Sequence, residues 1–106
     1  MSEKTLTGLH VWYLTVTVRL PDGTDLPAAA QNVTDRLTDA LWTDCIVYPG
    51  LCGLTITVPV EATGWARVPD YLNSLLYTAR IAPARIIQVQ AAQGAEVRRE
   101  VDDAAQ

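Results

Sequence analysis

Residues 9–41, LHVWYLTVTVRLPDGTDLPAAAQNVTDRLTDAL, decide the fold, because the spacing of their apolar residues changes from a strand period to a helix period. Within 9–20, one face carries the alternate positions Trp12, Leu14, Val16, Val18 and Leu20. Such alternation is typical of a half-buried strand. PDGTD at 21–25 then predicts a turn. Residues 26–41 have an apolar stripe at helical spacing and predict an amphipathic helix that Asp25 or Thr24 caps.

The rest of the chain repeats these two patterns. Strands are predicted at 44–48 and 53–60, joined by Pro49-Gly50, and at 84–92. A second helix is predicted at 68–81, after a lead-in loop at 63–67. The order β-α-β-β-α-β over residues 9–92 resembles the ferredoxin-like superfold. That resemblance implies an α+β sandwich, with a four-stranded antiparallel sheet and two helices on one face.

The predicted elements make one domain between two terminal segments. A chain of 106 residues has the length of one small domain. Residues 1–8 are polar, and we expect an N-terminal tail there. Residues 93–106 contain the charged stretch AEVRREVDDAAQ, which has too few apolar residues to dock firmly. We expect a frayed C-terminal tail over 93–106.

The composition argues against several classes of partner. The net charge is −4, from 8 basic and 12 acidic residues, and an acidic domain repels nucleic-acid phosphates. The longest uncharged run, Cys45–Val60, is too short for a membrane span and is broken by Pro-Gly. The N-terminal residues contain no apolar signal segment, and there are only two cysteines. We therefore expect a cytoplasmic protein that binds neither nucleic acid nor membrane.

The two cysteines are predicted to be buried, reduced core residues. A type II turn over Tyr48-Pro49-Gly50-Leu51 places 47 opposite 52 and 45 opposite 54. Cys45 and Cys52 then share the core face as diagonal neighbours, about 7–8 Å apart. That separation exceeds the usual disulfide range of about 4.4–6.8 Å. The chain also lacks the additional ligands that a zinc site needs.

No stretch of the sequence carries a catalytic or cofactor-binding motif. His10 is the only histidine, and no nucleophile or carboxylate lies beside it in the sequence. Residues 22–25 are interpreted as a turn followed by a helix cap. The sequence has no phosphate-binding loop, dinucleotide glycine pattern or serine-hydrolase elbow. We therefore expect no catalytic residue, metal site or cofactor.

Several well-known users of the ferredoxin-like superfold do not match this sequence. An RNA-recognition domain stacks bases on sheet aromatics, where this chain has mostly threonine and glutamine. A metallochaperone has paired cysteines in the first loop and an acylphosphatase has a glycine-rich loop, where this chain has PDGTD. A regulatory domain of the ACT type binds small molecules through the first loop and a helix start. DGTDLP at 22–27 is compatible with that type.

The sheet face away from the helices is predicted to be uncovered and almost free of charge, which suits packing against a second copy or a partner protein. The residues predicted to interact are Tyr13, Thr15, Thr17, Ile46, Tyr48, Thr55 and Thr57, with Trp65 and Arg67 from the lead-in loop. Ile86 is placed on the same face. We expect a homodimer formed through this face or through an edge strand. In a competing arrangement, residues 95–106 fold back over the face with Val97 and Val101 inward.

These observations favour a small non-enzymatic protein-interaction module. Compact, acidic domains without motifs are common among bacterial and phage accessory proteins that bind and modulate a host factor. The Ala-, Thr-, Val- and Asp-rich, Lys-poor composition suggests an actinobacterium or its phage as the source. The alternative is an ACT-like small-molecule sensor, or a small enzyme, with a pocket between the first loop and the second helix.

Overall fold

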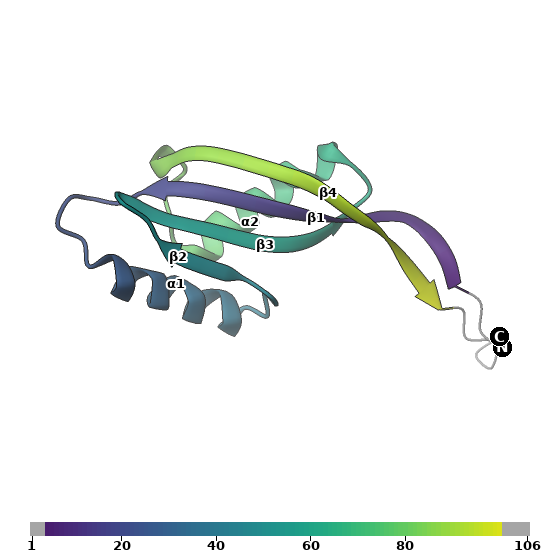
Figure 1. Ribbon diagram of the computed structural model, residues 1–106, viewed down its shortest axis with the longest axis horizontal. Coiled ribbons are helices and arrows are strands. Elements are labelled where there is room, and N and C mark those ends of the chain that lie inside the picture. The colour runs from purple at the N-terminus through teal and green to yellow at the C-terminus, as the bar shows by residue number, and fades with distance from the viewer. Residues whose placement is uncertain (1–3, 101–106) are drawn as a thin grey trace.

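The computed structural model describes residues 4–100 as one sheet and two helices (Figure 1). In chain order the elements are β1 (Lys4–Arg19), α1 (Leu26–Asp39), β2 (Ile46–Pro49), β3 (Gly53–Ala62), α2 (Val68–Ala79) and β4 (Ile86–Glu100). Short 3₁₀ turns at Trp65–Arg67 and Pro83–Arg85 precede α2 and β4. The predicted α+β class, with an antiparallel four-stranded sheet and two helices, is confirmed.

The strands lie in the order β2-β3-β1-β4, and each neighbouring pair is antiparallel. It follows that β1 is parallel to β2 with β3 between them, and that β3 is parallel to β4 with β1 between them. Each parallel pair is joined by one helix. The chain therefore contains two interleaved split β-α-β units, with β1 and β3 in the centre of the sheet and β2 and β4 at its edges.

The hydrophobic core lies between one face of the sheet and both helices. The alternate residues of β1 and β3 predicted to face inward are buried: Trp12, Leu14, Val16, Val18, Leu54, Ile56, Val58 and Val60. They form one cluster with the apolar stripes of the helices, which include Ala30, Val33 and Leu37 of α1 and Val68, Leu75, Leu76 and Ala79 of α2. Because both stripes meet the same sheet face, the opposite face has no helix on it among residues 4–100.

Local hydrogen bonds explain where the helices begin and end. The Asp25 carboxylate accepts from the Ala28 N–H at 3.1 Å, which confirms the predicted cap of α1. Leu41 has a φ of 66°, and the Trp42 N–H donates to the Leu37 carbonyl at 2.9 Å. This is a Schellman ending, so α1 ends at Asp39, two residues before the predicted boundary.

The terminal segments differ from the prediction. Lys4–Gly8 and residues 93–100 are not tails: they extend β1 and β4, which pair as a two-stranded ribbon projecting beyond the sheet (Figure 1). The Gly8 N–H donates to the Glu96 carboxylate at 3.0 Å. Strand pairing uses main-chain groups that every residue except proline has, so a low apolar content did not prevent it. Residues 95–100 therefore do not fold over the sheet, and Val101 lies outside the described residues.

The predicted register of the β2–β3 hairpin is wrong. Val47 pairs with Ile56 instead of lying opposite Cys52, and the Gly50 N–H donates to the Gly53 carbonyl at 2.7 Å. The backbone of β3 runs so close to β1 that a Cβ on Gly53 would clash with the Val18 carbonyl oxygen. Ten paired positions between β1 and β3 thus set where β3 starts, and the local Pro-Gly turn adapts to them.

The new register changes the interpretation of the cysteines. Both thiols are free, but Cys52 lies in the hairpin loop and is exposed. The prediction that it is buried is therefore wrong. Cys45 is half-buried and packs against the edge of the core. Burial raises the pKa of the Cys45 thiol, and the neighbouring Asp44 carboxylate adds to that rise.

Candidate functional site

Seven of the nine predicted interaction residues lie together on the uncovered side of the sheet. Directly opposed residues of antiparallel strands point to the same face. One row across the four strands consists of Ile46, Thr57, Thr15 and Gln90, and the next of Tyr48, Thr55, Thr17 and Gln88. Tyr13 lies one row further along β1, beside Ala92. We call the eight residues of the two rows, together with Tyr13, the open face.

The open face combines apolar rings with hydrogen-bonding groups and carries no charge. Tyr13, Ile46 and Tyr48 are 49%, 50% and 51% exposed. The four threonines are half-buried between them, and the Thr15 and Thr57 hydroxyls lie 3.2 Å apart in a hydrogen bond. The two rows contain the hydroxyls of threonine and Tyr48, the amides of glutamine and the aliphatic side chain of Ile46. Such a surface can hydrogen-bond and pack against another molecule.

A hollow of about 540 Å³ lies at one end of the open face. Its walls come from β1, β3, the start of β2 and the loop before β2. The lining residues are Val11, Tyr13, Thr43, Asp44, Ile46, Thr57, Pro59, Val60 and Glu61. The only charges in this lining are the carboxylates of Asp44 and Glu61. The hollow gives the open face a recess beside two of its large apolar side chains, Tyr13 and Ile46.

Tyr13 also has a structural role that sequence reasoning missed. A Cβ placed on Gly94 would lie 2.9 Å from Cε2 of Tyr13, so the tyrosine ring covers the backbone of this edge-strand glycine. An aromatic side chain beside a glycine on the neighbouring strand commonly shields the exposed backbone in this way. The signal was present in the sequence as a lone glycine in β4, but it can be interpreted only once the register of β1 and β4 is known.

Trp65 and Arg67 do not join the open face. Trp65 is 62% exposed, and its ring lies edge-to-face with the ring of Trp12 at a centroid separation of 5.3 Å. Trp12 faces the helix layer, where its indole N–H donates to the Ala62 carbonyl at 3.2 Å. Arg67 lies 4.0 Å from the Asp70 carboxylate on the exposed start of α2. These two predicted site residues thus lie on the helix side of the molecule.

Ile86 is also misplaced by the prediction. It pairs with Val18 and packs against the core, because the register between β1 and β4 shifts between Thr17 and Val18. A single extra residue in a strand moves its neighbours to the other face. Gln88 and Gln90 lie on the open face.

The other candidate sites offer less. The first loop contributes to a shallow hollow of about 200 Å³, lined by residues 20–24, Leu26, Leu51 and Cys52. The hairpin, and not α2, therefore forms its far wall. His10 lies half-buried in β1 and pairs with Glu96. Among residues 4–100, no three histidine, cysteine or acidic side chains gather as metal ligands would.

Within the same residues, no helix has both the length and the apolar character required to cross a membrane. Comparisons with known protein families, with curated proteins and with solved structures found no match to this chain.

Proposed function

We propose that the chain is a non-enzymatic, homodimeric protein-interaction module that binds a partner protein through the open face. The observation that supports this most is the pair of uncharged rows, with Tyr13, Ile46 and Tyr48 half-exposed among them. Exposed strands and sheet faces of monomeric proteins usually carry charges that discourage association. Here the centre of the face lacks them, and aromatic residues are enriched in the centres of interfaces.

The chemistry of the open face suits a protein partner better than other ligands. Hydroxyl and amide groups alternate with apolar side chains, as they do in interfaces that form and dissociate. Nucleic acid is disfavoured because the net charge is −4 and the two rows contain no basic residue. The partner we propose is a protein surface with apolar groups for Tyr13, Ile46 and Tyr48, and with hydrogen-bonding groups for the threonines.

The proposal also includes a ferredoxin-like fold and a cytoplasmic location. The two interleaved β-α-β units, with β1 and β3 central, support a ferredoxin-like fold. The two free cysteines are compatible with a reducing cytoplasm. In that setting, we propose an accessory protein of a bacterium or phage that modulates a host factor, a role suggested by the small size and acidic composition.

Site-specific crosslinking tests the open face directly. A photoreactive phenylalanine at Tyr48, which lies on the edge strand β2, is expected to crosslink one protein in the native cell. Thr57→Lys should abolish that crosslink because it places a charge in the central row. Asn32→Lys is the matched control, because Asn32 lies on the exposed side of α1. Equal melting temperatures of the two variants show that the fold is intact.

Two results would contradict the proposal. A crosslinked product of twice 11.6 kDa would show that a second copy occupies the open face. An identical crosslink in wild type, Thr57→Lys and Asn32→Lys would show that the partner binds elsewhere.

A further inference from the structure

The two edges of the sheet are protected very differently. β2 is four residues long and ends in Pro49, which has no N–H to offer another strand. Short edge strands and edge prolines are common means of preventing association. β4 is fifteen residues long and lies at the edge of the sheet beside β1, so within the described chain no strand lies along the outer side of residues 86–95.

β4 lacks the usual protection over most of its length. Residues 86–95, IIQVQAAQGA, contain no charge and no proline. Ile87 is 59% exposed and Val89 is 38% exposed. A long, uncharged edge with exposed β-branched residues is a template for pairing with another strand. Register shifts near Ile87 and after Gln93 leave an unbroken ladder over Gln88–Gln93, which defines the length available to a partner strand.

A second copy of the same edge fits this run. A two-fold axis at Gln90 pairs the strand antiparallel with itself, so each residue lies opposite the one equally far on the other side of Gln90. Residues 86–94 then oppose themselves over their whole length, and they contain no charge that would be set against an apolar side chain.

We propose that the chain dimerises by antiparallel pairing of β4 with β4 of a second copy, about a two-fold axis near Gln90. At this axis Val89 lies opposite Ala91 of the second copy, and Gln88 lies opposite Ala92. Every directly opposed pair in the unbroken ladder is then uncharged. A two-fold axis of this kind passes through the sheet from face to face, so it joins the two sheets into one sheet of eight strands.

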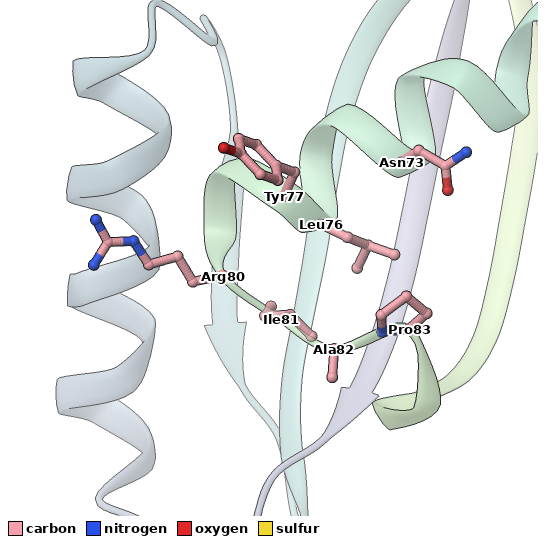
Figure 2. A pocket seen from close by; sticks show the side chains of 7 residues that line it. All are labelled: Asn73, Leu76, Tyr77, Arg80, Ile81, Ala82 and Pro83. Carbon is pink, nitrogen blue, oxygen red and sulfur yellow. The ribbon is translucent and has the colours of Figure 1, made fainter.

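An apolar groove next to the start of β4 supplies contact area that a strand edge alone lacks. It measures about 510 Å³ and lies between the end of α2 and the segment that leads to β4 (Figure 2). Its lining is Asn73, Leu76, Tyr77, Arg80, Ile81, Ala82 and Pro83. Tyr77 is 87% exposed in the described chain. Because α1 contacts β2 and β3, α2 is the helix on the β4 side, and the proposed axis brings the two α2 helices together.

This arrangement also bears on binding, in a step that rests on the proposed function. The axis keeps both open faces on the same side of the eight-stranded sheet. A dimer therefore presents two identical binding surfaces side by side and can hold a two-fold symmetric partner through both. Bivalent engagement of this kind strengthens binding without any new contact.

Sedimentation at micromolar concentration tests the pairing. Wild type and Thr57→Lys are expected at twice 11.6 kDa, and Gln90→Lys at 11.6 kDa, because only the last substitution sets two like charges across the axis. Thr57→Lys is required because Gln90 also belongs to the open face. Gln90→Ser is the matched neutral control and should remain dimeric. Gln90→Glu should also sediment at 11.6 kDa, because two acidic groups then repel across the axis. An equal mixture of Gln90→Lys and Gln90→Glu should recover the dimer, because the opposite charges attract across the same axis.

The outcomes separate this proposal from its alternatives. A wild-type mass of 11.6 kDa overturns it. A dimer that survives Gln90→Lys but dissociates in Thr57→Lys overturns it too, because the copies then meet through the open face. A failure of the mixture of Gln90→Lys and Gln90→Glu to recover the dimer refutes the register about Gln90. A dimer that captures no partner contradicts only the proposed partner binding. A monomer that captures a partner contradicts the edge pairing and the homodimeric state, but not partner binding through the open face.

Discussion

Ile56→Ala tests the assignment of one covered and one uncovered sheet face. Ile56 is 0% exposed and lies between Val16 of β1 and Val47 of β2. Alanine lacks three of its carbon atoms, and at about 0.8 kcal/mol for each buried methylene this loses about 2.4 kcal/mol. The cavity adds to that loss, so we expect a total of about 2–5 kcal/mol. Leu37→Ala, at a 0% exposed position of α1, belongs in the same range.

Thr57→Ala is the matched control, because Thr57 is the next residue of β3 and points to the opposite face. It removes the hydroxyl that lies 3.2 Å from the Thr15 hydroxyl, and such a bond contributes about 1 kcal/mol. The threonine is half-buried between its neighbours and fills no closed core, so no comparable cavity forms. We therefore expect Thr57→Ala to destabilise the chain much less than Ile56→Ala.

Urea unfolding followed by tryptophan fluorescence measures the three variants. With a slope of about 2 kcal/mol per molar urea, a loss of about 3 kcal/mol lowers the midpoint by about 1.5 M. The slope must be unchanged for the midpoints to be compared. Comparable losses at all three positions would refute the reasoning, because the open face would then be covered as thoroughly as the core.

Three further predictions follow from single contacts. A thiol reagent should label Cys52 rapidly and Cys45 slowly, because burial raises the pKa of the Cys45 thiol. Labelling of Cys45 should accelerate as the pH rises. Equal labelling rates of the two cysteines at all pH values would contradict this. Gly94→Ala should destabilise by about 1–3 kcal/mol in thermal melts, because its Cβ would meet the Tyr13 ring. The loss should shrink in a Tyr13→Ala background, and an unchanged loss would exclude that contact. Asp25→Ala should cost about 1 kcal/mol by removing the cap of α1, whereas Asp25→Asn should cost little.

Much of the candidate site could be predicted from alternation alone. Thr15 and Thr17 follow the period of two in β1, and Thr55 and Thr57 follow it in β3, so their shared face was predicted correctly. Trp65 and Arg67 were not placed correctly, because they lie in a 3₁₀ turn that has no strand period. Trp65 packs against Trp12, a residue more than fifty positions away in the chain, which its local sequence does not reveal.

The sequence by itself determined the order of the elements, the cap of α1 and the inward face of each central strand. These features depend on spacing and on neighbours within one or two turns, which a sequence displays directly. Only the tertiary structure decided the β2–β3 register, the exposure of Cys52 and the continuation of β4 to Glu100. Those features depend on main-chain hydrogen bonds to distant strands. Nearly every residue can make such bonds, so residue type alone does not show where they form.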